Sequence, residues 1–237
     1  MKEYLLPVKS KERISDDLLS VTFDISGTKF SFKSGQYITI RLIDPIEYDY
    51  KNNIRSYSIV NPPHIKDEIT VLLRLSDSGF SKNIINIKEG TIVSVSDAMG
   101  NLNIEKNVNY TDVFIAGGVG VTPFKSIIED LLNSGHSNEI ILFYSNRKRS
   151  GTAFLNDFLD LANKHNNFKF IPVIDDISDK EWKFEKGFID INMLEKYITD
   201  MSNPVFHIVG PPQMVNSVIN ILEKNGVKEE RIRTERY

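Results

Sequence analysis

The chain has 237 residues with 29 basic and 32 acidic side chains, a formal net charge of −3, so it has no broad basic surface and we expect no nucleic-acid partner. The absence of cysteine excludes disulfides, thiolate zinc sites and a cysteine-held iron-sulfur cluster within these residues. No run reaches the roughly 18 apolar residues of a membrane span and the N-terminus lacks a secretory pattern, so we expect a cytoplasmic protein.

Roughly the first hundred residues alternate apolar and polar side chains over short segments, which is typical of half-buried antiparallel strands. Turn-forming residues separate these segments, and only residues 81–87 show helical spacing. We predict strands at 18–25, 36–42, 57–60, 69–75 and 91–95. Short strands at this spacing predict an antiparallel β-barrel, and we place this domain at residues 1–107.

The pattern changes near residue 110, where apolar strands begin to alternate with helical segments. We predict strands at 113–116, 140–144, 168–174 and 205–209, and helices beginning at 123 and covering 152–162, 191–198 and 213–224. This alternation is typical of a parallel sheet that is covered by crossover helices. We therefore predict a doubly wound α/β domain at residues 108–237.

A glycine-rich turn, Ala116–Pro123, lies between an apolar strand and a helical segment. Gly117, Gly118 and Gly120 allow a sharp turn and a close approach of a ligand to the backbone, and Pro123 suits the first helical position. The start of a helix offers N–H groups and a partial positive charge to a pyrophosphate. We expect a dinucleotide here, although the spacing G-x-G-x-x-P departs from the usual pattern and a tight turn without a ligand is the alternative.

Two later segments extend this ligand edge. Gly210–Met214 repeats the order of apolar strand, glycine, proline and helix, and ligands of open α/β sheets bind beyond the carboxyl ends of strands. A purely structural turn is the alternative there. Ser145 and Arg147 belong to a basic segment that lacks a carboxylate, which favours the 2′-phosphate of NADPH over the ribose diol of NADH. A solvated loop is the alternative for this segment.

Four motifs stand in order along the chain: Arg55–Ser58, Gly117–Pro123, Gly210–Pro212 and Glu235–Tyr237. With this order and spacing, nearly the whole chain resembles the ferredoxin-NADP reductase superfamily. The resemblance implies a barrel that binds FAD, a second domain that binds NADPH or NADH, and electron transfer to a separate iron-sulfur or heme protein. A free-flavin reductase, or a flavin-binding subunit with a regulatory or assembly role, is the alternative.

The resemblance also assigns roles to single residues. Arg55 matches the arginine that pairs with the flavin pyrophosphate, Tyr57 the ring that packs on the flavin, and Ser58 the hydroxyl near flavin N5. A guanidinium fork and an aromatic face suit those ligands. The resemblance further implies that Glu235 lies close to the reacting rings and that Tyr237 stacks on the flavin face that the nicotinamide must reach. We take Ser58, Glu235 and Tyr237 as the catalytic residues.

The other binding residues that the resemblance implies lie in the phosphate segment and the dinucleotide turns. They are Gly79, Phe80, Ser81, Gly117, Gly118, Gly120, Thr122, Pro123, Ser145, Arg147, Gly210, Pro211 and Met214. The chain departs from many relatives at Val209, which replaces a cysteine, and at Asp97–Gly100, beside the expected flavin edge. The four histidines lack metal-ligand spacing, so we predict no metal site and ordinary surface or sheet positions for them.

Overall fold

The computed structural model describes residues 2–102, 104 and 110–235, and the chain divides into two compact units. The first unit comprises residues 1–104 and 122–134, and the second comprises residues 105–121 and 135–237. An antiparallel sheet forms the first unit and a parallel sheet the second, which confirms the predicted fold class. The predicted division between 107 and 108 lies outside the described residues and stays a prediction. Helix α2 (Val121–Asn133) groups with the first unit.

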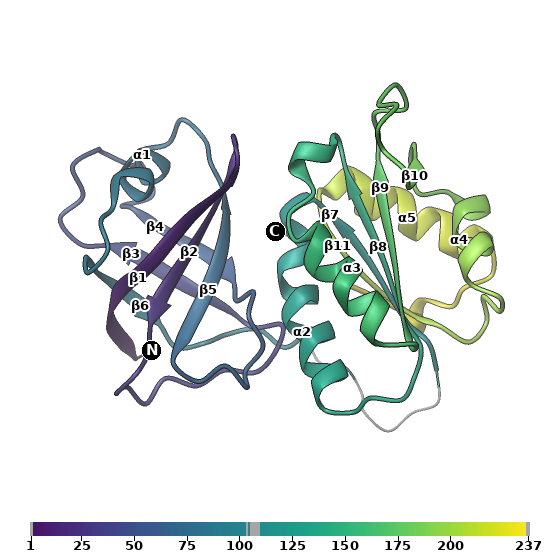
Figure 1. The fold of residues 1–237 in the computed structure, drawn as a ribbon, viewed down its shortest axis with the longest axis horizontal. Coiled ribbons are helices and arrows are strands. Elements are labelled where there is room, and N and C mark those ends of the chain that lie inside the picture. Colours follow the sequence, from purple (N-terminus) through teal and green to yellow (C-terminus); the bar gives the residue numbers. More distant parts are fainter. Residues whose placement is uncertain (1, 103, 105–109, 236–237) are drawn as a thin grey trace. The chain divides into compact units, whose positions relative to one another are not determined.

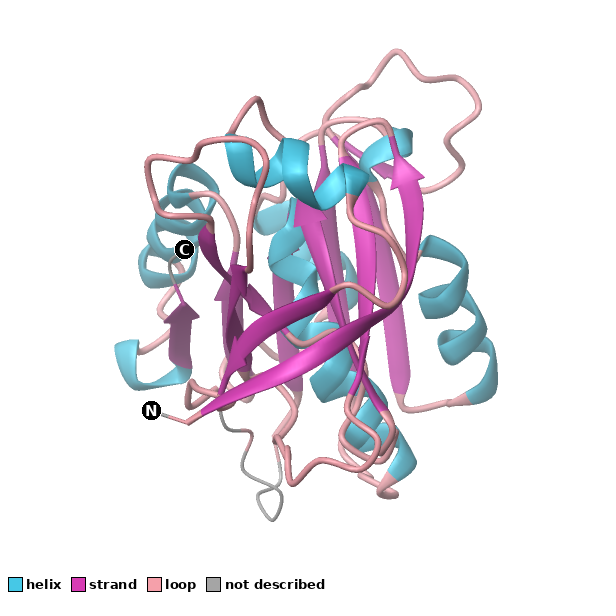
Figure 2. Cartoon of the chain, turned by 90° about the vertical axis from the view of Figure 1, so that its left-hand side faces the viewer, coloured by secondary structure: helices cyan, strands magenta, loops and turns pink. Residues whose placement is uncertain are grey.

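Six antiparallel strands make the sheet of the first unit, and Figures 1 and 2 show their strong twist. Their order across the sheet is β4 (Ile54–Ser58), β3 (Tyr37–Leu42), β6 (Ile92–Ser96), β1 (Glu3–Ser15), β2 (Leu18–Asp24) and β5 (Glu68–Arg74). A bridge between Ile59 and Val71 joins the end of β4 to β5. The two outer strands therefore meet, as the closure of a barrel requires.

The barrel core follows from the alternation of apolar residues along these strands. Each strand sends every second side chain inward, and the buried set includes Leu6, Val21, Phe23, Ile38, Ile40, Val71, Val93 and Val95. Strand β1 was not predicted, although it pairs with both β2 and β6. Its middle, Lys9–Arg13, is exposed and polar, and its register with β2 shifts twice, so the alternation that marks a strand is missing there.

The second unit is a parallel sheet in the order β10 (Glu185–Lys186), β9 (Phe168–Ile174), β8 (Ile140–Asn146), β7 (Asp112–Gly117), β11 (Val205–Val209) and β12 (Ile232–Glu235). From β7 the chain builds β8 and β9 on one side and β11 and β12 on the other. The order therefore reverses between β7 and β11, which is where ligands of such sheets bind. The short strand β10 and the C-terminal strand β12 were not predicted.

Helices cover both faces of the parallel sheet (Figure 1). On one face α4 (Ile191–Tyr197) and α5 (Pro212–Lys224) pack Leu194 and Val218 against inward residues of the central strands such as Ile115. On the other face α3 (Leu155–Lys164) places the Phe158 ring 5.0 Å from that of Phe170 in β9. The apolar runs of the strands are continuous because both faces are buried.

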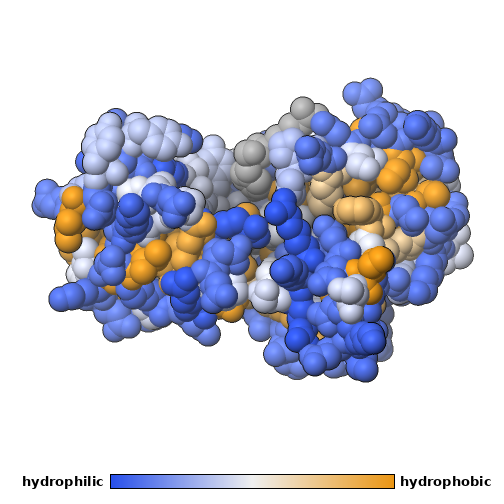
Figure 3. All heavy atoms as spheres, turned by 90° about the horizontal axis from the view of Figure 1, so that it is seen from above, coloured by the Kyte–Doolittle hydropathy of each residue, from blue (hydrophilic) through white to orange (hydrophobic). Residues whose placement is uncertain are grey.

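The surface is mainly polar, and the view in Figure 3 shows apolar side chains in separate patches between hydrophilic areas. Among the described residues, no helix combines the length and the apolar character that crossing a membrane requires. Some large apolar or aromatic side chains are nevertheless exposed, including Ile46 at 93% and Tyr48 at 85% in the loop between β3 and β4. That loop leads directly to the predicted flavin motif.

Candidate functional site

Three of the predicted flavin residues, Arg55, Tyr57 and Phe80, lie together in the first unit. Arg55 and Tyr57 lie two residues apart on β4, hence on one face, and Phe80 belongs to α1 (Gly79–Asn86). The Phe80 ring centre is 5.9 Å from that of Tyr57 and 5.4 Å from the guanidinium carbon of Arg55. Burial raises the pKa of the Tyr57 phenol. The site thus combines a cation with two neutral aromatic faces.

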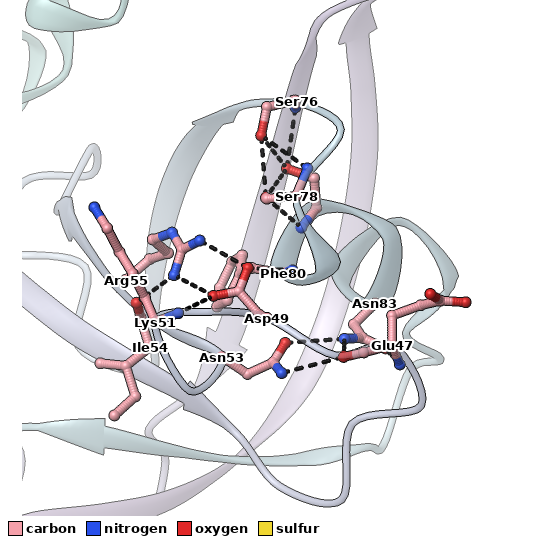
Figure 4. A network of polar contacts seen from close by, with 11 residues as sticks. Glu47, Asp49, Lys51, Asn53, Ile54, Arg55, Ser76, Ser78, Phe80 and Asn83 are labelled. Carbon is pink, nitrogen blue, oxygen red and sulfur yellow. Dashed lines mark hydrogen bonds and ion pairs between the residues drawn. The ribbon is translucent and has the colours of Figure 1, made fainter.

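A buried carboxylate, that of Asp49, holds the Arg55 guanidinium (Figure 4). Arg55 donates from Nη1 to Oδ1 at 2.9 Å and from Nη2 to Oδ2 at 2.8 Å. The backbone N–H groups of Lys51 and Phe80 donate to the same two oxygens, at 2.8 Å and 3.0 Å. These donors, Arg55 foremost, lower the pKa of Asp49 to about 2. Asp49 was not predicted, because nothing in the sequence of a polar loop marks which carboxylate turns inward.

The predicted phosphate segment Gly79–Ser81 begins α1, but the chain itself uses two of its backbone donors. The N–H of Phe80 bonds Asp49, and the N–H of Ser81 donates to Ser78 Oγ at 3.2 Å. A Cβ on Gly79 would lie 1.9 Å from the carbonyl oxygen of Tyr48, so the packing of the loop already requires glycine there. Contact of this segment with a phosphate stays a prediction.

Ser58 ends β4 and is 6% exposed. It pairs in register with Tyr37 of β3, which in turn bridges to Met99. The segment Asp97–Gly100, which departs from many relatives, therefore joins the barrel through Met99 beside this strand end. The role of Ser58 near a flavin stays a prediction.

The two predicted dinucleotide turns lie side by side at the carboxyl edge of the parallel sheet. A Cβ on Gly117 would lie 2.6 Å from Met214 Sδ, and one on Gly210 would lie 3.0 Å from the Gly117 nitrogen. A side chain at Gly117 or Gly210 would therefore require a shift of Met214 or of the neighbouring turn. Gly118 and Gly120 form a 3₁₀ turn, and the expected helix begins at Val121, two residues before Pro123. The buried Thr122 and Pro123 thus lie within its first turn, where proline costs no helical hydrogen bond.

The basic segment after β8 was predicted without acidic neighbours, but the segment after β9 places several beside it. Asp175 follows β9, and its Oδ1 lies 3.5 Å from Ser145 Oγ, while Asp176 N donates to the Arg147 carbonyl at 3.2 Å. Arg149 forms ion pairs with Asp179 and Glu181. The segment itself lacks a carboxylate, as stated, but the neighbouring strand end brings Asp175 beside it. The signal was available, since Asp175 directly follows a predicted strand whose end reaches the same edge.

The C-terminal strand brings Glu235 to the same edge. Glu235 pairs in register with Val209, which pairs with Ala116, so it lies level with the residues that precede Gly117 and Gly210. Tyr237 lies outside the described residues, and its predicted place on a flavin face is untested. Among the described residues, no group of three histidine, aspartate or glutamate side chains is placed to hold a metal ion.

Comparisons with known proteins agree with this arrangement. Residues 5–104 match the family model of the oxidoreductase FAD-binding domain, and residues 114–220 that of the oxidoreductase NAD-binding domain. The reductase component DmpP of phenol 2-monooxygenase from Pseudomonas sp. (strain CF600) is 30% identical over 87% of this chain and 58% of its own. Reductase component 2 of the terephthalate 1,2-dioxygenase from Comamonas sp. is 30% identical over 81% of this chain and 55% of its own. The chain thus spans little more than half the length of these relatives.

Solved structures share the fold. The ferredoxin NADP+ reductase from Neisseria gonorrhoeae, with bound FAD and NADP, has a TM-score of 0.83 at 19% identity, over 100% of this chain and 99% of that chain. The cytochrome b5 reductase domain of Ulva prolifera nitrate reductase gives 0.84 at 20%, over 99% and 97% of the two chains. An FAD-binding and an NAD-binding domain of oxidoreductases follow each other along most of the sequence, so the chain belongs to the FAD- and NAD-binding oxidoreductases and has the fold of ferredoxin-NADP reductase-like flavoproteins.

Proposed function

We propose that this chain transfers a hydride from a nicotinamide nucleotide to bound FAD and passes the electrons singly to a separate acceptor protein. The observation that carries the proposal is the cluster of Arg55, Tyr57 and Phe80 in the FAD-binding domain. When bound, FAD supplies the chemistry of accepting a hydride and releasing single electrons. The chain's part is to bind, orient and shield that cofactor.

The residues present fit such a ligand. Arg55 is 18% exposed at its side chain, so its guanidinium can reach an incoming pyrophosphate while it stays clamped. The Tyr57 ring offers an aromatic face, and Ser58, at the end of the same strand, offers a hydroxyl to the reacting edge. In the second unit, the turns at Gly117 and Gly210 and the carboxylate of Glu235 would receive the nicotinamide nucleotide.

The acceptor is proposed as an iron-sulfur or heme protein, since these 237 residues contain no cysteine to hold a cluster. A relative named as the reductase component of phenol 2-monooxygenase supports a partner of the oxygenase kind. Protein that is loaded with FAD and desalted should remain yellow and reduce ferricyanide with NADH or NADPH. Loss of flavin with turnover that saturates in added FAD would indicate a free-flavin reductase. Retained flavin without turnover would indicate a regulatory or assembly subunit.

For the nucleotide we propose a preference for NADH. A carboxylate accepts hydrogen bonds from a ribose diol and repels a 2′-phosphate. Asp175 lies beside Ser145 at the carboxyl edge of the sheet, where we propose that the ribose of the nucleotide binds. Among the neighbouring basic side chains, Arg149 is paired with Asp179 and Glu181 of the loop after β9. Burial raises the pKa of Asp175, although the hydrogen bond from Ser145 and the positive charge of Arg147 act to lower it.

Titration with NAD⁺ and NADP⁺ tests this preference without turnover. Asp175→Asn should raise the affinity for NADP⁺ relative to NAD⁺ by about tenfold, the effect of one charge-assisted contact. Asp176→Asn is the matched control, because it removes the same charge one residue away from a carboxylate that bonds Ser178 instead. A wild-type preference for NADP⁺, or equal shifts in both variants, would contradict the role of Asp175.

A further inference from the structure

The strongest feature that the family assignment does not explain is the Asp49 carboxylate beside Arg55. Its side chain is 0% exposed, and each of its oxygens accepts two hydrogen bonds. Burying a charge is costly unless it is paired and fully hydrogen-bonded. Here the pairing is complete, so Arg55 and Asp49 form a fixed unit rather than a surface ion pair (Figure 4).

The contacts of Arg55 leave one edge of its guanidinium for a ligand. A guanidinium has five N–H donors in a rigid fork. Within the described part of the chain, Arg55 uses three: Nη1 bonds Asp49 and the Ile54 carbonyl, and Nη2 bonds Asp49. The Nε hydrogen and the second Nη2 hydrogen make no hydrogen bond there. These two lie on the same side of the fork, where they can bind two oxygens of a phosphate in parallel.

The loop does not depend on Asp49 alone for its position. Asn83 of α1 accepts hydrogen bonds from the N–H groups of Ile46 and Glu47, and its amide donates to the Glu47 carbonyl and to Asn53 Oδ1. This second set of bonds ties the loop to α1 independently of the carboxylate. Asp49 adds bonds from the N–H groups of Lys51 and Phe80 to this set, and its side chain also orients the guanidinium of Arg55.

We propose that Asp49 is a positioning residue for the flavin: it clamps the Arg55 guanidinium so that its Nε and Nη2 donors face the pyrophosphate of FAD. The clamp also balances the charge of Arg55, so the site selects a ligand by directed hydrogen bonds as well as by attraction. The inference rests on the proposed binding of FAD. Asp49 touches no reacting atom and acts only through Arg55.

Flavin binding by the apoprotein, followed by the quenching of FAD fluorescence, tests the clamp. Asp49→Asn should weaken FAD binding by about tenfold or more, because the arginine loses its fixed orientation. Glu47→Gln is the matched control: it removes the same charge from the same loop, but Glu47 contacts α1 through its backbone, so its affinity should equal that of the wild type. Failure of the wild type itself to bind FAD would refute the proposed function instead.

A double-mutant cycle separates positioning from a general effect on folding. If Asp49 acts through Arg55, then Asp49→Asn adds less than about a twofold loss to Arg55→Ala. Independent, multiplying losses would overturn the proposal, as would tighter FAD binding by Asp49→Asn, which would mean that the carboxylate competes with the ligand. If Asp49→Asn does not fold, Arg55→Lys decides: it keeps the charge without the fork, and wild-type affinity in that variant would also overturn the clamp.

Discussion

Each unit of the protein buries a carboxylate completely, and the two differ in their partners. Asp49 in the barrel pairs with an arginine, whose charge does not depend on pH. Asp112, which begins β7, pairs with histidines: its Oδ1 lies 2.9 Å from His207 Nε2 and its Oδ2 3.5 Å from His136 Nε2. The first arrangement is therefore constant over the working pH range, whereas the second changes with the protonation of His207.

The difference extends to how well the groups are satisfied. All four hydrogen bonds to Asp49 are within 3.0 Å. Among the described residues, Asp112 Oδ2 and His207 Nδ1 are buried without a hydrogen bond. Asp112 also lies at the opposite end of β7 from Gly117. The pair that does not depend on pH, Asp49 and Arg55, therefore lies beside the predicted flavin site. The pH-sensitive pair of Asp112 and His207 lies at the end of β7 that is opposite to the predicted nucleotide turn at Gly117.

The largest effect should follow from removing the cation of the constant pair. Arg55→Ala leaves Asp49 buried without its partner, so we expect a loss of FAD affinity of about 10- to 100-fold and a melting temperature lower by about 5 °C or more. Arg149→Ala is the control, since the Arg149 and Glu181 side chains are 51% and 75% exposed and such pairs contribute little. Equal melting temperatures in the two variants would show that the burial of Asp49 carries no energetic weight.

The histidine cluster should give a smaller effect that depends on pH. Burial lowers the pKa of His207 from its usual value of 6.5, Arg233 acts in the same direction, and Asp112 opposes them. The unfolded chain then binds a proton near pH 6.5 that the folded chain does not, so stability falls as the pH drops below about 6.5, by at most about 1.4 kcal/mol per pH unit for one proton. Denaturant titrations at pH 7.5 and 5.5 measure this fall.

Two variants assign that fall to a residue. His207→Gln keeps a donor toward Asp112 and should reduce the difference in unfolding free energy between the two pH values. The exposed His64 serves as the control, and His64→Gln should leave the difference unchanged. A pH dependence that survives His207→Gln would mean that His207 does not titrate as its burial indicates.

Among the described residues, the sequence patterns missed β1 in the barrel and β10 and β12 in the parallel sheet, but they matched the bounds of strands best in the parallel sheet. Strands β9 and β11 have the predicted bounds, because apolar runs that are buried on both faces are easy to recognise. Strand β1 escaped prediction, since its exposed middle reads as a charged loop. Arg55, Tyr57 and Phe80 were identified by resemblance and do lie together.

The two carboxylates that were not predicted escaped notice for the same physical reason. Asp49 and Asp175 gain their importance from contacts with another segment, Arg55 in one case and Ser145 in the other. Local propensity carries no information about such contacts, and an acidic residue in a loop is usually solvated. A strand end is the partial exception, because topology alone brings Asp175 to the edge that Ser145 occupies.

The smallest expected effect is that of pH on the pair of Asp49 and Arg55, which should not change between pH 8 and pH 5. This prediction tests most directly the difference between that pair and the histidine cluster. Asp49 has a pKa of about 2, against 3.8 in the absence of its partners. A lowered carboxylate pKa contributes stability that is fully present above 3.8 and is lost as the pH falls through about 2. Asp49 is therefore ionised throughout the range from pH 8 to pH 5, and the clamp on Arg55 should not change.

The ratio of the FAD dissociation constants of Asp49→Asn and the wild type should stay within about twofold over that range, because effects of all other titrating groups are common to both proteins and cancel. A ratio that falls toward one as the pH approaches 5 would place the titration of Asp49 in the working range, and the pair would then be pH-sensitive like the histidine cluster.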